Sequence, residues 1–160
     1  MPPGFGPGGI FIFAAPSSIA IDAQDNVWVL HRPRTLKPDQ IAMAAPPVIV
    51  FDGAGNFIKA WGGSGNGYEW PEREHGIHID YKGFVWLGGN YCPLPGDVGL
   101  KPVTDDALLK FTQDGRFVMQ IGRSNTPYHR IFWWFLHLAQ PSRLGFLHFR
   151  DRYAVVRWSV

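Results

Sequence analysis

Short apolar runs alternate with clusters of glycine, proline, aspartate and asparagine over the first 123 residues of the chain. The runs are rich in valine, isoleucine, phenylalanine and tryptophan, which favour strands, and the clusters hold the residues that form tight turns. The chain has 19 glycines and 14 prolines, which punctuate it too often for long helices. The pattern therefore predicts an all-β fold of many short antiparallel strands.

The apolar runs form an internal repeat. The stretch SIAIDAQDNVWVL at 18–30 aligns without a gap on GIHIDYKGFVWLG at 76–88, and VIVFDGAGNFIKAWGG at 48–63 aligns on LLKFTQDGRFVMQIGR at 108–123. Each unit is a strand, a turn, a strand, a long loop, a strand, a second turn and a last strand. A repeat of four short antiparallel strands is typical of a β-propeller blade.

The repeat divides the chain into four parts. We predict a Gly/Pro-rich lead-in over 1–16, a first blade over 17–63, a second blade over 64–123 and an atypical tail over 124–160. The predicted strands are 19–22, 27–30, 48–51 and 57–61 in the first blade and 77–80, 84–87, 107–111 and 117–121 in the second. Long loops, 31–47 and 88–106, join the second strand of each blade to the third. Long loops on a regular scaffold are where function tends to lie.

The tail departs from the repeat. Residues 124–160 contain five arginines, no lysine, one acid and nine of the 24 aromatic residues. This shift in composition indicates a frameshifted or otherwise unrelated end joined to two blades. The alternative is a native helix over 129–140, with apolar residues on one face and Pro141 ending it.

Composition and charge narrow the function classes. The chain is 46% hydrophobic and 18% charged, which suits a globular fold with a core. A formal net charge of +2, with both signs mixed along the chain, gives no sign of nucleic-acid or membrane binding. The apolar stretch near the N-terminus is too short for a signal peptide or a membrane span, so a cytoplasmic location is the default expectation. The single cysteine, Cys92, rules out a disulfide framework and a cysteine-based zinc site.

The pattern GIxIDxxGxVWL, followed by LxKFxxDGxFxxQIG, resembles the NHL-repeat family of six-bladed β-propellers over residues 17–123. Within it, SIAIDAQDNVWVLHRP and EHGIHIDYKGFVWL resemble the first two blades of the peptidyl-α-hydroxyglycine α-amidating lyases. These enzymes split a peptide ending in α-hydroxyglycine into a peptide amide and glyoxylate. The resemblance implies that Arg32 is the catalytic arginine and His75 one of three histidine ligands of zinc. It also implies that the backbone carbonyls of Ile19 and Ile77 bind a structural calcium ion.

Topology and chemistry bear on these assignments. In an antiparallel blade the start of the first strand and the end of the second share a rim, so Ile19, Arg32, His75 and Ile77 are expected on one face. A three-histidine zinc site with an open position can bind a substrate oxygen, and a guanidinium can bind the substrate carboxylate. The alternatives are that His75 is a loop or packing residue and that Arg32 is an ordinary solvated arginine.

The departures from the lyases are substantial. Only one of the three zinc-binding histidines has a counterpart, the Asp-Gly-Tyr segment that holds the family's catalytic tyrosine is absent, and two blades fall short of six. We therefore expect a fragment of a lyase-like propeller that is inactive as this chain and retains neither zinc nor calcium. Its parent would act on a peptide or small-molecule substrate. The alternative is a non-catalytic NHL propeller that serves as a protein- or ligand-binding scaffold.

Several polar and aromatic residues have simpler expected roles. Asp22 and Asp80 are expected to cap the turns after their strands rather than bind metal. His78 is expected to pack, since it lies three residues from His75 and an extended strand directs the two side chains to opposite faces. Trp28 and Trp86 are expected at equivalent core positions.

Overall fold

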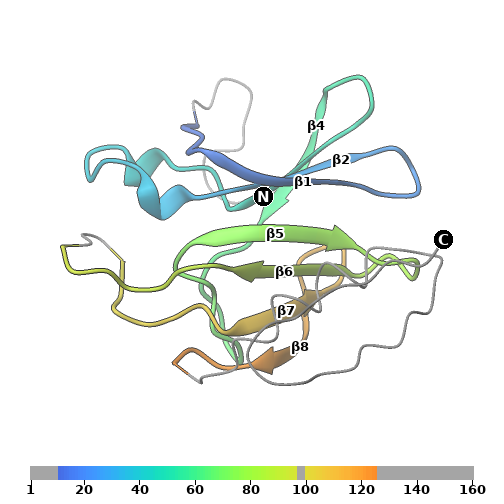
Figure 1. Cartoon of the computed structure of the whole chain (residues 1–160). Coiled ribbons are helices and arrows are strands. Elements are labelled where there is room, and N and C mark those ends of the chain that lie inside the picture. The colour runs from blue at the N-terminus through green and yellow to red at the C-terminus, as the bar shows by residue number, and fades with distance from the viewer. Residues whose placement is uncertain (1–10, 97–99, 126–160) are drawn as a thin grey trace, which may run out of the picture.

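The computed structural model describes residues 11–96 and 100–125, which form two four-stranded antiparallel sheets (Figure 1). The all-β prediction is confirmed for these residues. The predicted tail helix and most of the lead-in lie outside the described residues. Sheet 1 contains β1 (Pro16–Ile21), β2 (Val27–His31), β3 (Val48–Phe51) and β4 (Phe57–Trp61), and sheet 2 contains β5 (Glu74–Ile79), β6 (Val85–Gly89), β7 (Ala107–Phe111) and β8 (Phe117–Gly122).

The strand bounds match the predicted ones closely, with one systematic difference. Strands β1 and β5 begin at Pro16 and Glu74, three residues before the predicted starts at Ile19 and Ile77. Both strands continue past a bulge, which lies between Pro16 and Ser18 in β1 and between Glu74 and Gly76 in β5. A bulge absorbs one extra residue and keeps the ladder going, so polar residues that read as loop belong to the strands.

The repeat in the sequence is a repeat in structure. Ile19 pairs with Val29 in sheet 1, and Ile77 pairs with Leu87 at the equivalent place in sheet 2. In all four hairpin turns, the fourth residue has a left-handed backbone conformation, which favours glycine. These residues are Asp25, Gly55, Gly83 and Gly115, with φ angles of 61°, 86°, 79° and 83°.

Aspartates cap these turns as expected. Asp22 Oδ1 accepts hydrogen bonds from the backbone of Gln24 and Asn26 at 2.9 Å, and Asp80 Oδ1 accepts equivalent bonds from Lys82 and Phe84. Since both carboxylates already accept several protein hydrogen bonds, their pKa values stay below the usual range even though burial acts in the opposite direction.

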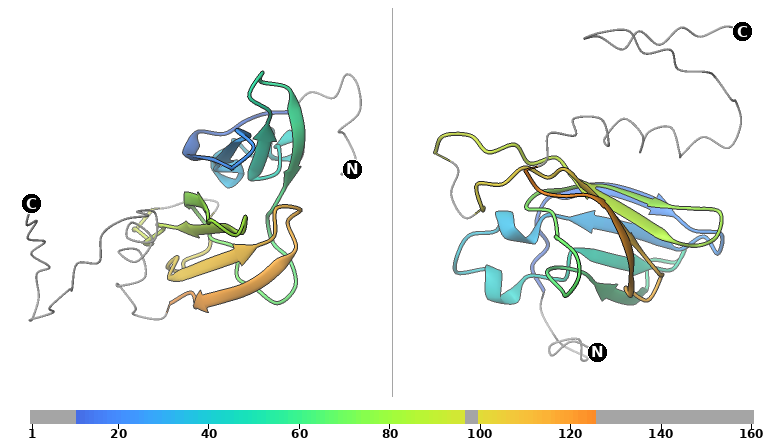
Figure 2. Two further views of the ribbon diagram at one scale, coloured as in Figure 1. Left: turned by 90° about the vertical axis from the view of Figure 1, so that its right-hand side faces the viewer. Right: turned by 90° about the horizontal axis from the view of Figure 1, so that it is seen from below.

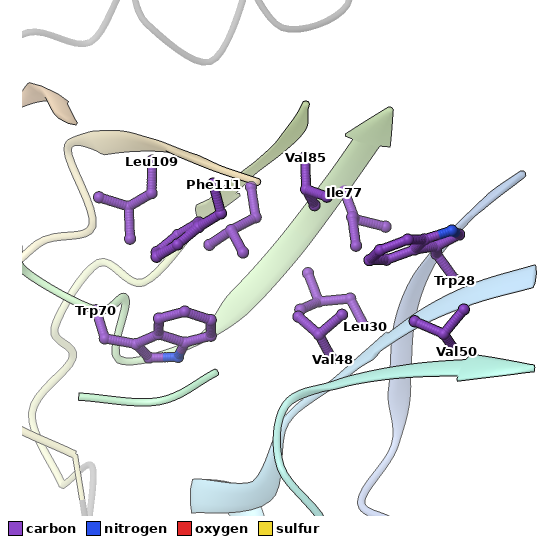
Figure 3. Close-up of a cluster of buried hydrophobic side chains, with 10 residues drawn as sticks. Trp28, Leu30, Val48, Val50, Trp70, Ile77, Val85, Leu109 and Phe111 are labelled. Carbon is purple, nitrogen blue, oxygen red and sulfur yellow. The ribbon is translucent and has the colours of Figure 1, made fainter. Parts of the chain in front are cut away.

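The core lies between the two sheets, which Figure 2 shows as separate layers with β1 next to β5. Figure 3 shows side chains of β2 and β3 directed towards those of β5, β6 and β7. Trp28 is fully buried there, while its equivalent Trp86 is half-buried on the opposite side of sheet 2, so only one of the two occupies the expected core position. The cluster comprises Trp28, Leu30, Val48, Val50, Trp70, Ile77, Val85, Leu87, Leu109 and Phe111.

Within the described residues, helical structure is limited to the long loop between β2 and β3. This loop holds two 3-10 turns, η1 (Pro33–Thr35) and η2 (Ile41–Met43). Ile12 pairs with Ala44 of the same loop and ties the N-terminal segment to it. Over residues 11–96 and 100–125 there is no helix of the length and apolarity needed to cross a membrane.

Candidate functional site

Two of the four residues singled out by the lyase resemblance, Arg32 and His75, meet at one rim, between the end of β2 and the start of β5. Arg32 follows the last residue of β2, and His75 is the second residue of β5. The Arg32 Nη2 group lies 3.2 Å from His75 Nδ1, and Arg32 Nε donates to the backbone carbonyl of Glu74 at 2.7 Å. Two residues 43 positions apart in the sequence are therefore in direct contact between the two sheets.

The contact fixes the chemical form of His75. Because a guanidinium only donates hydrogen bonds, His75 Nδ1 must accept, and the proton of the neutral ring is on Nε2. Burial, followed by the charges of Arg32 and Arg73, lowers the pKa of His75, so the ring is neutral at pH 7. A metal could bind Nδ1 only if Arg32 moved away, and it could bind Nε2 only if the proton moved.

The two isoleucines assigned to calcium lie midway along β1 and β5. Ile19 is the fourth residue of β1 and Ile77 the fourth of β5, so neither starts its strand as expected. Their side chains differ, since Ile77 is buried in the core and Ile19 is 63% exposed. The backbone N–H of Ile77 donates to Ser18 Oγ at 3.3 Å, which links the two strands. The calcium role of the carbonyls stays a prediction.

Sequence reasoning missed Glu74, a buried acid behind this contact. Its side chain is fully buried; Oε1 accepts a hydrogen bond from Trp70 Nε1 at 2.7 Å, while Oε2 has no hydrogen-bond partner. Burial raises the pKa of Glu74 to about 7, against the smaller opposing effect of the Trp70 hydrogen bond. A glutamate beside a predicted zinc ligand could have drawn attention, but only the bulge in β5 shows that it points inward.

Two further acids, Glu72 and Asp105, form hydrogen bonds that join segments of the same rim. Glu72 binds the Arg34 guanidinium and accepts a hydrogen bond from the backbone of Lys101 at 3.1 Å. Burial acts to raise the pKa of Glu72, but the bond from Arg34 and the neighbouring positive charges outweigh it and lower the pKa. Asp105 accepts backbone bonds from Glu72, Arg73 and Tyr91 at 2.7–2.9 Å. These bonds join the segments that contain Glu72, Tyr91 and Asp105 at one rim.

The described residues do not fit the three-histidine zinc site of the lyases. Across the part of the chain that the structure describes, no three His, Cys, Asp or Glu side chains are grouped so that they could hold a metal ion. His31, the residue before Arg32, is fully buried and both ring nitrogens are engaged, by Ala14 N at 3.3 Å and by the Pro46 carbonyl at 2.9 Å. His75 is thus a single candidate ligand, and its Nδ1 is occupied by Arg32.

Comparison with known proteins adds no family assignment. No model of a known protein family matches the chain, and no curated protein matches it either.

Proposed function

We propose that the chain is part of a β-propeller related to the amidating lyases, and that Arg32 binds the carboxylate of a peptide-like ligand at the rim. The supporting observation is how Arg32 is held. Its Nε and Nη2 groups, which form one edge of the guanidinium, donate to Glu74 and His75. The adjoining edge, Nη1 with the second hydrogen of Nη2, makes no hydrogen bond to a described residue. A planar group oriented in this way suits a carboxylate, which accepts two parallel hydrogen bonds.

In this proposal the ligand is an N-acylglycine end of a peptide, as in the α-hydroxyglycine substrates of the lyases. Arg32 binds and orients the carboxylate, and His75 and Glu74 hold Arg32 in place. The donors present do not complete the lyases' zinc site, so we propose that this chain binds such an end without cleaving it and retains neither zinc nor calcium.

Binding of N-acetylglycine tests the proposal. We expect weak, millimolar binding, seen as saturable NMR shifts of the Arg32 and His75 side chains. Arg32→Lys should weaken it roughly tenfold, because a lysine loses one of two charge-assisted hydrogen bonds, worth about 1.5 kcal/mol. The exposed Arg116, in the turn between β7 and β8, gives the control Arg116→Lys, which should leave binding unchanged.

The control ligand is N-acetylglycinamide, which has the same shape without the negative charge. Equal binding of the amide and the acid, or equal binding by wild type and Arg32→Lys, would rule out a carboxylate site at Arg32.

Zinc retention provides a separate prediction. The purified chain, loaded with zinc and passed through gel filtration, should hold far less than one zinc per chain, because one histidine is too few for a stable site. Atomic absorption gives the ratio. One zinc per chain that is lost on His75→Ala would contradict the prediction and support a zinc site like that of the lyases.

A non-catalytic binding scaffold is the second candidate, and one observation favours it. Apolar side chains are exposed on and beside the loop between β2 and β3, namely Phe13, Ile41 and Met43, at 50%, 50% and 45%. Exposed apolar groups that gather near one rim often mark a protein-binding surface. Failure of the carboxylate titration, with the fold intact, would favour this scaffold function.

A further inference from the structure

The two sheets expose equivalent positions very differently. Ile77 of β5 is 5% exposed, whereas Ile19, its equivalent in β1, is 63% exposed. Ile79 packs against the core, whereas its equivalent Ile21 is also 63% exposed. At these two positions the strand pattern is therefore covered in β5 and open in β1, while Ile49 of β3, on the same face of sheet 1, is 2% exposed.

The reason is that the sheets pack through unlike faces. Sheet 1 contributes a face that we call the tryptophan face, made of Trp28, Leu30, Val48 and Val50. Sheet 2 contributes the opposite face of its repeat, the isoleucine face, made of Ile77, Val85, Leu87, Leu109 and Phe111. By the repeat, sheet 1 carries its own isoleucine face on the far side and sheet 2 its own tryptophan face. The equivalent residues are Ile19, Val27, Val29, Ile49 and Phe51 in sheet 1, and Trp86, Gly88, Leu108 and Lys110 in sheet 2.

We propose that a second copy of this chain packs the tryptophan face of its sheet 2 onto the isoleucine face of sheet 1, repeating the internal interface between chains. Such a contact joins unlike surfaces, so it continues head to tail and either closes into a ring or grows into an open chain. Three copies supply six four-stranded sheets, which lies within the range of closed propellers. The expected assembly is a trimer.

Details of the outer tryptophan face support the match. Trp86 Nε1 donates to Asp80 Oδ2 at 2.9 Å, and Trp28 Nε1 donates to Asp22 Oδ2 at 2.8 Å, so the two indoles are held alike. Each indole also carries a lysine ammonium over its ring, Lys110 at 4.6 Å from Trp86 and Lys59 at 5.1 Å from Trp28. The two lysines occupy different positions, because Lys110 stands where the internal interface has Val50 and pairs with Asp80 at 3.7 Å, so the outer tryptophan face is the more polar of the two.

The contact between copies should be weaker than the internal one. The bonds from Arg32 to the start of β5 and from Ile77 to Ser18 have no counterpart, because Asn90 stands at the position equivalent to Arg32 and Gly76 at that of Ser18. The association therefore rests on apolar area and should depend on concentration.

Analytical ultracentrifugation of the full chain tests the proposal. Wild type should sediment as the 18.0 kDa monomer when dilute and shift towards a trimer as the concentration rises. Ile21 pairs with Val27 on the isoleucine face of sheet 1, and Ile121 pairs with Leu108 on the tryptophan face of sheet 2; both are exposed. Ile21→Asp and Ile121→Asp should each weaken association at least tenfold. Tyr81→Asp is the control, because Tyr81 is 93% exposed in a turn outside both faces, and it should associate like wild type.

Mixing the two variants gives the decisive result. Each retains one intact face, so an equimolar mixture should form a one-to-one dimer that neither variant forms alone. A mixture that stays monomeric would overturn the proposal, as would an association unaffected by either substitution. A wild type that stays monomeric at all concentrations would also overturn it.

Discussion

Between pH 4.5 and pH 7, ionisation of Glu74 is expected to lower the free energy of unfolding of wild type by about 3 kcal/mol, and the variant Glu74→Gln should not show this loss. The carboxyl is fully buried with one oxygen unpaired, so the folded chain holds its proton up to about pH 7, whereas the unfolded chain releases it near pH 4.5. Below pH 4.5 both states are protonated and Glu74 costs nothing. As the pH rises above 4.5, Glu74 ionises first in the unfolded chain, which lowers the free energy of the unfolded state. The free energy of unfolding therefore falls until Glu74 also ionises in the folded chain.

Urea unfolding of wild type and Glu74→Gln at pH 5 and pH 8 measures this effect as the change in their difference with pH. The comparison removes any constant cost of the amide and the titration of other groups. Glu72→Gln is a matched control, because the pKa of Glu72 is shifted in the opposite direction and its effect on the free energy of unfolding should have the opposite pH dependence. The pKa of Glu72 is lowered in the fold, so its contribution is present above pH 4.5 and lost as the pH falls, and its replacement should destabilise the chain at neutral pH. A difference between wild type and Glu74→Gln that is the same at both pH values would contradict the prediction.

The regular part of this fold is readable from the sequence because its signals are local. Alternating apolar residues and Asp- or Gly-containing turns predict the strands, and the two copies of the pattern predict two equivalent sheets. The turn at Asp25 shows how strong the pattern is, since an aspartate takes the left-handed position that glycine holds in the other three turns. The alternation does not reveal which face of each sheet is covered, because Ile19 and Ile77 are identical in the pattern and differ only in what packs against them.

The candidate site was predictable only in part. Topology and the resemblance led to Arg32 and His75, and the structure places them in contact. The roles assigned to them are still proposals. The burial of Glu74 could not be anticipated, because it depends on the bulge at the start of β5 and on Trp70, a residue that the repeat pattern does not include. Long-range contacts of irregular segments leave little trace in a single sequence, whereas strand periodicity leaves a clear one.

Replacing Phe111 by alanine is expected to lower the free energy of unfolding by about 3–5 kcal/mol, the usual cost of removing a buried aromatic ring. Phe111 is fully buried on the isoleucine face of sheet 2. Its ring lies 5.1–5.9 Å from four other aromatic rings, so the cavity left behind has rigid walls that cannot easily collapse. These rings belong to Trp61, Tyr68, Trp70 and Phe117.

The repeat supplies a matched control for this substitution. Phe51 is the equivalent of Phe111 in sheet 1 but is half-buried, and Phe51→Ala should cost only about 1 kcal/mol because it opens no enclosed cavity. Urea unfolding at concentrations where the chain is monomeric gives both values, and Phe111→Leu provides a milder substitution if Phe111→Ala does not fold. Equal losses at Phe51 and Phe111 would mean that the two isoleucine faces are equally covered in the monomer. That result would remove the asymmetry on which head-to-tail packing of copies depends.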